Sequence, residues 1–460
     1  MAKLFGTDGI RGVANQPPLT VETAVAVGRA LVRLLRDKNK ARPDQETISI
    51  VIGRDTRLSG DMLESAFCAG ACSMGADVFT LGVFPTPGVA CLTRAEKAAA
   101  GVVISASHNP YTDNGIKIFD HNGHKLSQSL ETRLEEIIEQ VTDGQRHDFQ
   151  GQPGRIRPLP EARDRYAMFL NQTVFAGPLS LSGSRSRLGD LRLVVDCANG
   201  SAGAIADKVM TTANFIFNHP DGRNINEQCG SEHPRELCRQ VKALGADAGF
   251  AFDGDADRVV AVDETGRVLT GDRILAMCAN FMKADNSLKN NLVVSTVMSN
   301  IGLSRALREM GIDHLTSDVG DRHVLEKMRA SGAVIGGEDS GHMIFSEHQT
   351  TGDGLLAALI LCRIMQHTGR RLSDLAGCME VYPQELINVP VKDKPDLDTV
   401  ASVRKTIKEE TARLKQDGRV LVRYSGTQPL CRVMVEAPTA TAARQVAGRI
   451  AGAIEEAIGG

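Results

Sequence analysis

The chain has 460 residues, with 53 Lys and Arg against 56 Asp and Glu, and a formal net charge of −3. Because nucleic-acid backbones and anionic membrane surfaces are bound through an excess of positive charge, this balance argues against either partner. The absence of Trp and the presence of only four Tyr also leave few aromatic side chains for stacking on bases. With 42% hydrophobic and 24% charged residues, the composition is that of a globular protein of several domains.

The amino-terminal segment, MAKLFGTDGIRG, has no long apolar stretch, and no run approaches the roughly 20 apolar residues of a membrane span. The ten cysteines are sparse and include no CxxC pair, which indicates buried, reduced thiols. We therefore expect a cytoplasmic protein with neither a membrane nor a nucleic-acid partner.

Three stretches of the chain share one order of predicted elements. Each begins with a short apolar run, rich in β-formers, that ends in a polar loop before a helical pattern: 47–57, 191–200 and 291–300. Further along each stretch, a second apolar run stops at a loop dense in polar residues: 101–110, 248–258 and 333–342. Strands that alternate with helices indicate parallel βαβ units, which bind ligands at the carboxyl ends of their strands. We predict three related domains that each give one loop to a common cleft.

Composition also suggests the domain boundaries. Residues 148–160 are rich in Gly and Pro, and beyond about residue 375 the βαβ pattern gives way to a charged helix, two short strands and a last amphipathic helix. The expected fold class is α/β, with three related mixed-sheet α/β domains plus a smaller C-terminal α+β domain around a central cleft. The predicted domains are 1–155, 156–258, 259–374 and 375–460.

The first polar loop, SASHNP at residues 105–110, follows a predicted buried strand. A serine hydroxyl is a weak nucleophile that needs a base, a metal or a phosphoryl environment to react. His108 and Lys117 supply a titratable ring and a cation within one short segment. The alternative interpretation is a polar turn that begins at Asn109 and Pro110.

The second loop places Asp253, Asp255 and Asp257 at alternate positions, a hard-oxygen cluster suited to Mg²⁺ or Ca²⁺. An EF-hand is excluded because Arg258 stands where that loop needs Gly and a strand pattern follows. A strand followed by DxD is also typical of aspartyl-phosphate phosphatases, which would make Asp253 a nucleophile. Since three close carboxylates repel one another without a cation, we favour a metal site over a solvated turn.

The third loop, GEDSGH, presents short polar groups that suit sugar hydroxyls, and His342 could exchange a proton near neutral pH. Near the carboxyl terminus lie two guanidinium groups, two hydroxyls and a glycine, which are groups of the kind that bind phosphate. We call this set the phosphate cradle: Arg423, Ser425, Gly426, Thr427 and Arg432. The early segment FGTDGIRG follows no predicted strand, which excludes a dinucleotide fingerprint, and its Arg11 could reach a phosphoryl group.

Taken in order, FGTDGIRG, SASHNP, DGDADR, GEDSGH and RYSGT resemble the signature set of the α-D-phosphohexomutases, and the likeness runs from Phe5 to the last helix. The segments 297–300, 319–322 and 350–354 are most similar to bacterial members that act on glucosamine phosphates. The resemblance implies interconversion of glucosamine 6-phosphate and glucosamine 1-phosphate, which feeds UDP-N-acetylglucosamine and cell-wall synthesis. It also implies a phosphoserine enzyme and glucosamine 1,6-bisphosphate as intermediate or primer.

The resemblance assigns roles to the motif residues. Ser107 is the expected phosphoserine, and one Mg²⁺ per chain is expected on Ser107, Asp253, Asp255 and Asp257. The other expected catalytic residues are Arg11, His108, Lys117 and His342. The expected substrate-binding residues are Arg258, Glu338, Ser340, Arg423, Ser425, Gly426, Thr427 and Arg432. We also expect a homodimer.

Two positions depart from the family pattern. Gln428 replaces a Glu in the phosphate loop, and Asp339 stands where glucosamine-specific members more often carry Gln or Asn. The first change bears on turnover and the second on the choice of sugar. Three alternatives therefore stay open: a phosphomannomutase/phosphoglucomutase of the same family, an aspartyl-phosphate phosphatase and a non-catalytic sugar-phosphate sensor.

Overall fold

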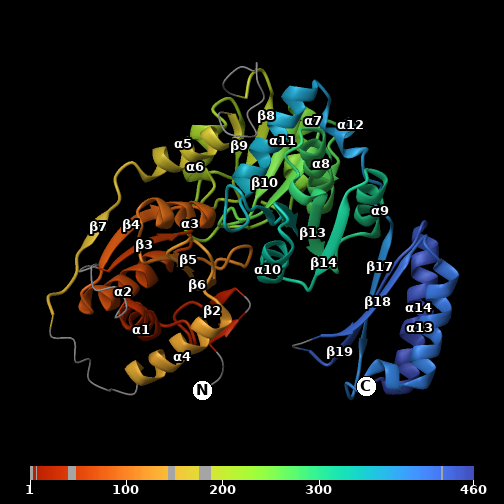
Figure 1. Ribbon diagram of the computed structural model, residues 1–460, viewed down its shortest axis with the longest axis horizontal. Coiled ribbons are helices and arrows are strands. Elements are labelled where there is room, and N and C mark those ends of the chain that lie inside the picture. The colour runs from red at the N-terminus through yellow and green to blue at the C-terminus, as the bar shows by residue number, and fades with distance from the viewer. Residues whose placement is uncertain (1–3, 7, 40–47, 143–150, 176–187, 426–427) are drawn as a thin grey trace. The chain divides into compact units, whose positions relative to one another are not determined.

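The computed structural model describes residues 4–6, 8–39, 48–142, 151–175, 188–425 and 428–460 (Figure 1). Their contacts divide the chain into two compact units. The larger unit takes up residues 1–298 and 312–377, and the smaller one takes up 299–311 and 378–460. Of the four sheets among the described residues, the first three lie in the larger unit and the fourth lies in the smaller.

The first sheet has seven strands in the order β1-β2-β6-β5-β3-β4-β7. β3 lies parallel to β4 and β5, while β6 lies antiparallel to β5. The strands are β1 (Phe5–Gly6), β2 (Gly9–Val13), β3 (Ser49–Arg54), β4 (Asp77–Val83), β5 (Ala100–Ile104), β6 (Asp113–Asp120) and β7 (Ile156–Pro158). The helices of this part are α1 (Val21–Asn39), α2 (Gly60–Ser73), α3 (Thr86–Ala95) and α4 (Gln128–Thr142).

Successive side chains of β3 point to opposite faces of the first sheet, and helices cover both faces. Ile50 and Ile52 belong to the buried cluster that includes residues of α1, α2 and α4. On the opposite face, Gly53 lies against Val89 of α3, where an added Cβ would be 2.8 Å from a Val89 methyl. Successive strand residues point to opposite faces, so a fully apolar strand is expected where helices cover both.

The second and third sheets repeat the core of the first. The second has the order β12-β11-β10-β8-β9 and the third the order β14-β13-β15-β16. The second contains β8 (Leu193–Asp196), β9 (Asn214–Ile216), β10 (Ala248–Phe252), β11 (Val259–Asp263) and β12 (Val268–Leu269). The third contains β13 (Leu292–Thr296), β14 (Asp313–Ser317), β15 (Ile335–Gly337) and β16 (Met343–Phe345).

Each sheet has a central strand with a parallel strand on either side, and one of these neighbours continues into an antiparallel hairpin partner. The central strands are β3, β8 and β13, and the hairpins are β5–β6, β10–β11 and β15–β16. The predicted threefold repeat of α/β units is confirmed. The three polar loops lie at the carboxyl ends of β5, β10 and β15, as the pattern predicted.

Helices from different parts of the chain cover these sheets. α7 packs with β8, β10 and β11 in one apolar cluster, and α10 packs with β13 and β16 in another. α11 is buried along almost its whole length, as its nearly uninterrupted apolar sequence requires. The helices of this region are α5 (Ala162–Phe175), α6 (Gly203–Val209), α7 (Arg235–Leu244), α8 (Gly271–Ala284), α10 (Asp321–Ser331), α11 (Gly354–Thr368) and α12 (Leu372–Ala376).

The smaller unit has the α+β character predicted for the C-terminal segment. Its antiparallel sheet has the order β17-β19-β18, and α13 and α14 accompany it. Val433, Val435 and Ile450 belong to its buried cluster. Its elements are α9 (Ile301–Glu309), β17 (Gln384–Pro390), α13 (Ala401–Leu414), β18 (Arg419–Tyr424), β19 (Leu430–Glu436) and α14 (Ala440–Ile458).

Pairing of β7 with β4 extends the first sheet to residue 158, and β12 extends the second sheet to residue 269. The domain boundaries at 155, 258 and 374 stay predictions.

No helix in the part of the chain that the structure describes is long and apolar enough to cross a membrane. All ten cysteines are free thiols, as predicted, and most are buried.

Candidate active site

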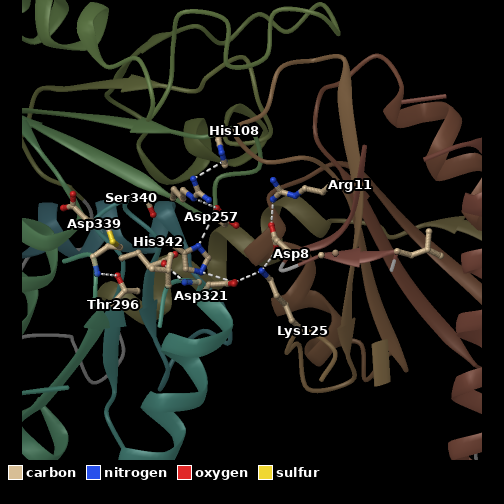
Figure 2. A pocket seen from close by; sticks show the side chains of 18 of the residues that line it. Asp8, Arg11, His108, Lys125, Asp257, Thr296, Asp321, Asp339, Ser340 and His342 are labelled. Atoms are coloured by element: carbon tan, nitrogen blue, oxygen red, sulfur yellow. Dashed lines mark hydrogen bonds and ion pairs between the residues drawn. The ribbon is translucent and has the colours of Figure 1, made fainter. Parts of the chain in front are cut away.

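The three strand-end loops meet at a cavity of about 610 Å³ in the larger unit. Figure 2 shows side chains from distant segments facing this space, with Asp8, Arg11 and Lys125 on one side and Asp321 and His342 on the other. The sequence-predicted residues that line the cavity are Arg11, His108, Asp257, Arg258, Glu338, Ser340 and His342. The cavity is rich in both positive and negative groups, as a site for a polar, charged ligand requires.

Ser107 is fully buried and has a φ of +54°, a left-handed backbone conformation that is rare for a residue with a side chain. Its Oγ lies 2.5 Å from Oδ2 of Asp253, to which it donates a hydrogen bond. Its N–H donates to Ser105 Oγ at 2.9 Å. A strained residue of this kind persists only when its surroundings hold it, and such residues cluster at functional sites.

Groups outside the serine motif supply that support, and two of them, Asp55 and Arg57, are buried. The Arg57 guanidinium donates to the carbonyl oxygens of Ser107 at 2.9 Å and of Asn109 at 2.8 Å, and Asp55 Oδ2 accepts from Arg57 Nε at 2.8 Å. Asn226, from the segment before β10, donates to the carbonyls of Ser107 and Asn109 at 2.9 and 3.1 Å. Sequence reasoning missed these residues. The run RDTR, at the end of the first predicted strand, was a signal for Asp55 and Arg57.

Asp253, Asp255 and Asp257 are all buried, and each offers a carboxylate oxygen within 4.8 Å of the other two. Oδ1 of Asp255 and Oδ1 of Asp257 are buried without a hydrogen-bond partner among the described residues. Burial and the neighbouring charges of Asp257 and Asp255 raise the pKa of Asp253 well above its usual range. Oxygen ligands with unsatisfied buried lone pairs fit a hard divalent cation such as Mg²⁺.

Lys117 lies on β6 next to this acidic loop. Its Nζ is 2.8 Å from Asp255 Oδ2 and 3.1 Å from Asp8 Oδ2, and its side chain is almost fully buried. Burial alone would lower the pKa of Lys117, but the charges of Asp255, Asp8 and Asp257 outweigh it and raise the pKa. The ammonium group is therefore held charged in this structure.

A second lysine, Lys125, bridges two sides of the cavity. Its Nζ pairs with Asp8, which follows β1, and with Asp321, the first residue of α10 (Figure 2). Burial opposes ionisation of Asp8, yet Lys117, Lys125 and Arg11 keep its pKa well below the usual range. Neither Lys125 nor the role of Asp8 and Asp321 in this bridge was predicted from the sequence.

Arg258 connects the loop that carries the three aspartates with the loop that carries Ser107. Its Nη1 lies 3.0 Å from Nδ1 of His108, and its backbone N–H donates to Asp253 Oδ1 at 3.2 Å. Burial and the charge of Arg258 lower the pKa of His108. A neutral His108 can accept the Arg258 hydrogen bond, and its Nδ1 also lies 3.4 Å from Ser107 Oγ.

His342 is buried between two carboxylates. Its Nδ1 is 3.7 Å from Asp257 Oδ1 and its Nε2 is 3.7 Å from Asp321 Oδ2. Burial opposes the imidazolium form, but Asp257 and Asp321 outweigh it and raise the pKa of His342. The Gly352 N–H donates to Nε2 at 3.1 Å and favours the neutral ring. Opposing influences of this kind suit a group that exchanges a proton.

Glu338 and Ser340 line the cavity, and Glu338 Oε1 accepts the Gly320 N–H at 2.9 Å. Asp339 lies beside them, but its main-chain oxygen accepts from Gly271 N–H at 2.9 Å and its Oδ1 accepts from Asp272 N–H at 3.3 Å. Asp339 thus holds the first turn of α8, where an anionic side chain is favourable. An Asn could accept the same hydrogen bond.

The predicted phosphate cradle lies in the smaller unit. Arg423 on β18 stands directly opposite Arg432 on β19, an arrangement of like charges that is unfavourable unless an anion or carboxylate compensates. Ser425 Oγ accepts the Gln428 N–H at 3.3 Å, and Lys394, missed by sequence reasoning, donates to the Ser425 carbonyl at 2.6 Å. Gly426 and Thr427 fall outside the described residues.

Four family models match the chain in succession. They are the α/β/α domains I, II and III of phosphoglucomutase/phosphomannomutase, over residues 2–145, 164–266 and 270–382, and its C-terminal domain, over 386–453. The chain belongs to the phosphoglucomutase/phosphomannomutase family. This membership confirms the resemblance and the predicted fold class.

Curated relatives within the family match over the full length. The chain is 48% identical to the phosphoglucosamine mutase of Syntrophus aciditrophicus, with 100% of both chains covered. It is 50% identical to the phosphoglucosamine mutase of Desulforapulum autotrophicum, with 99% of this chain and 100% of the relative covered.

Solved structures with the same fold include proteins with different names. A family protein from Burkholderia thailandensis matches with a TM-score of 0.76 at 24% identity, over 99% of this chain and 97% of that one. The N-acetylphosphoglucosamine mutase of Aspergillus fumigatus, solved with GlcNAc-6P and magnesium, matches with a TM-score of 0.63 at 19% identity, over 99% and 96%.

The structure brings most of the predicted site residues together in the larger unit. Ser107 donates a hydrogen bond to Asp253, one carboxylate oxygen from each of the three aspartates lies within 4.8 Å of the other two, and Lys117 lies beside Asp255. Arg423, Ser425 and Arg432 lie close to one another in the smaller unit. The residues that sequence reasoning missed are Asp8, Asp55, Arg57, Lys125, Asn226, Asp321, Gly352 and Lys394.

Proposed function

We propose that this family member is a phosphoglucosamine mutase, an isomerase that interconverts glucosamine 6-phosphate and glucosamine 1-phosphate for UDP-N-acetylglucosamine synthesis. The observation that carries the chemistry is the buried Ser107 hydroxyl, 2.5 Å from Asp253 and beside carboxylate oxygens with no hydrogen-bond partner among the described residues. The choice of sugar rests on full-length relatives that are 48% and 50% identical and carry this name.

The donor set of Asp253, Asp255 and Asp257, with an oxygen of phosphorylated Ser107, would hold one Mg²⁺. The A. fumigatus relative was solved with magnesium, which supports this assignment. When bound, the cation neutralises negative charge on the phosphoryl group. The oxygens proposed to face the cation are Oδ1 of Asp255 and Oδ1 of Asp257, which accept no hydrogen bond among the described residues.

The reaction begins with the phosphoryl group on Ser107. A substrate hydroxyl attacks phosphorus, the bond from phosphorus to Ser107 Oγ breaks, and a sugar 1,6-bisphosphate forms. The bisphosphate then turns around, and Ser107 Oγ attacks the other phosphoryl group, which restores the phosphoserine and releases the isomer. Catalysis of such a transfer rests on alignment of the reacting atoms and on stabilisation of charge. Arg57 and Asn226 favour alignment, because their hydrogen bonds to the Ser107 carbonyl hold its backbone in place.

Proton transfer and charge are supplied by side chains around the cavity. Lys117, which is buried beside Asp255, and His342, which lines the cavity, are the proposed partners of the sugar hydroxyl protons. Arg11 and Arg258 also line the cavity and are proposed to place positive charge near the phosphoryl group. His108 orients the serine loop through Arg258.

The remaining site residues are proposed to bind substrate in both orientations. Glu338 and Ser340 hydrogen-bond to ring hydroxyls, and the cradle of the smaller unit grips the phosphate that is not reacting. The proposed cradle residues are Arg423, Ser425, Gly426, Thr427 and Arg432. A homodimer and a cytoplasmic location stay proposals, and light scattering of the purified protein tests the first.

Intact-mass and peptide analysis of purified protein tests the central step. We expect a phosphate on Ser107, or its appearance after incubation with glucosamine 1,6-bisphosphate, and loss of mutase activity in Ser107→Ala. If Ser107 is never phosphorylated and no activity follows priming, the protein is a sugar-phosphate sensor instead. Phosphate release that survives Ser107→Ala but is lost in Asp253→Asn would identify an aspartyl-phosphate phosphatase.

The substrate is tested separately by comparing kcat/KM for glucosamine 1-phosphate, mannose 1-phosphate and glucose 1-phosphate. We expect the amino sugar to be preferred. Equal or greater efficiency on either neutral sugar contradicts the assignment and favours a phosphomannomutase/phosphoglucomutase.

A further inference from the structure

The start of α3 touches the acidic loop at a position that the proposed mechanism leaves unexplained. Thr86, the first residue of α3, is fully buried. Its Oγ1 donates a hydrogen bond to Asp255 Oδ2 at 2.6 Å, and its N–H donates to the Asp255 carbonyl oxygen at 2.9 Å. These two bonds join an element that covers the first sheet to a loop that leaves the second sheet.

The Thr86 hydroxyl and the Lys117 ammonium contact the same carboxylate oxygen. Oδ2 of Asp255 receives Thr86 at 2.6 Å and Lys117 at 2.8 Å. Oδ1 of Asp255 is buried and has no hydrogen-bond partner among the described residues. Two donors on one oxygen fix the rotation of the carboxylate, and they leave its other oxygen free for an electrophile.

The neighbouring aspartates are held differently. Asp253 accepts from the Ser107 hydroxyl and from the Arg258 N–H. The charged groups near Asp257, including Arg258 and His342, stand 3.6 to 3.7 Å away. Thr86 therefore supplies the one hydroxyl among the described residues that hydrogen-bonds to Asp253, Asp255 or Asp257 from outside the serine loop.

We propose that Thr86 is a positioning residue for the divalent cation: its hydroxyl holds Asp255 so that Oδ1 faces the metal. The inference rests on the proposed Mg²⁺ site. Groups that hydrogen-bond to metal ligands orient them, and their removal typically weakens metal affinity by about 10- to 100-fold. Thr86 makes no direct contact with the cation in this proposal and acts through Asp255.

Two substitutions separate the hydrogen bond from packing. Thr86→Val keeps the shape of the side chain but removes the hydroxyl, whereas Thr86→Ser keeps the hydroxyl but loses the methyl group. Mg²⁺ is titrated into each unphosphorylated protein in a calorimeter, with Asp255→Asn as the control that removes a ligand. We expect the Mg²⁺ Kd to rise about tenfold in Thr86→Val and to stay within about twofold of wild type in Thr86→Ser.

Steady-state kinetics give a second measurement. The Mg²⁺ concentration for half-maximal activity should rise in Thr86→Val, while KM for the sugar phosphate at saturating Mg²⁺ should not change. Wild-type affinity in Thr86→Val, or equal losses in both variants, would overturn the inference and assign Thr86 to packing. The proposed Mg²⁺ site itself fails only if the wild type binds no Mg²⁺, so the two failures are distinguishable.

Discussion

At the scale of single residues, Gly352 determines where the His342 ring lies. A Cβ on Gly352 would stand 2.5 Å from Cε1 and Nε2 of the ring, closer than real Cβ contacts allow. The Gly352 N–H also donates to Nε2 at 3.1 Å. Glycine is needed here for close approach, since its backbone must pack directly on the imidazole.

We predict that Gly352→Ala displaces His342 and lowers kcat by about 10- to 100-fold, because a shift of about 1 Å in a reacting group costs that much. Steady-state assays of the purified variant measure this. In the background of His342→Ala the same glycine substitution should change kcat little. An undiminished kcat in Gly352→Ala would show that the ring position does not limit the reaction.

Asp196, at the end of β8, offers a prediction about pH. Burial raises its pKa to about 6, although the N–H groups of Ala198 and Gly230 donate to it at 2.8 and 2.9 Å. Because this native pKa lies above the ordinary value of 3.8, the native protein holds a proton that the unfolded chain releases between the two. Stability therefore falls as the pH rises through this window and levels off above pH 6.

Protonation of Asp196 in the native state contributes on the order of 3 kcal/mol to the free energy of unfolding at low pH. Urea unfolding of wild type and Asp196→Asn between pH 4 and pH 7.5 tests it. The stability of wild type relative to the variant should decline from pH 4 to pH 6 and then stay constant. A difference that is flat, or that grows with pH, contradicts the prediction.

At the scale of elements, the amino end of α10 is held against the start of α4. Arg322 donates to both carboxylate oxygens of Glu131, at 2.5 and 3.0 Å, and the Glu131 side chain is 9% exposed. Lys125 pairs with Asp321 one residue earlier on α10. These pairs connect the first and third α/β repeats beside the cavity.

We predict a coupling free energy of about 1 kcal/mol or more between Arg322 and Glu131, since bidentate, partly buried pairs exceed exposed ones. A double-mutant cycle with Arg322→Ala and Glu131→Ala, measured by chemical unfolding, gives the coupling. The exposed pair of Arg133 and Glu136 is a matched control and should give less. Additive effects of the Arg322 and Glu131 substitutions would contradict the prediction.

Elements and loops differed in how far the sequence predicted them. The strands before SASHNP, DGDADR and GEDSGH were predicted because apolar runs and polar loops are local signals. The hairpin of β1 and β2 was not predicted, since its two short strands are stabilised by pairing of β2 with the distant β6. The contacts of Asn226 with the serine loop likewise depend on how two sheets pack.

At the scale of the whole molecule, the two units hold different charged groups. The larger unit holds the three aspartates at 253, 255 and 257, and the smaller unit holds the facing pair Arg423 and Arg432. A ligand that binds only the native state stabilises the unit it binds. We predict that Mg²⁺ raises the unfolding temperature of the larger unit and that inorganic phosphate raises that of the smaller.

Differential scanning calorimetry with each ligand measures the two transitions. Asp255→Asn should remove the response to Mg²⁺ and leave the response to phosphate, and Arg432→Ala should do the reverse. If phosphate still stabilises the smaller unit equally in Arg432→Ala, the facing arginines are not its binding site.

The sequence by itself determined the threefold α/β repeat, the places of Ser107 and the three aspartates at strand ends, and the family, because these depend on local patterns and short motifs. The tertiary structure decided which side chains support them: Arg57 beneath the serine loop, Thr86 on Asp255, Lys125 between two repeats, and Gly352 against His342. Such partners are far apart in the chain, and their meeting depends on sheet register and domain packing. The near-neutral net charge similarly concealed a site in which buried lysines and carboxylates compensate one another.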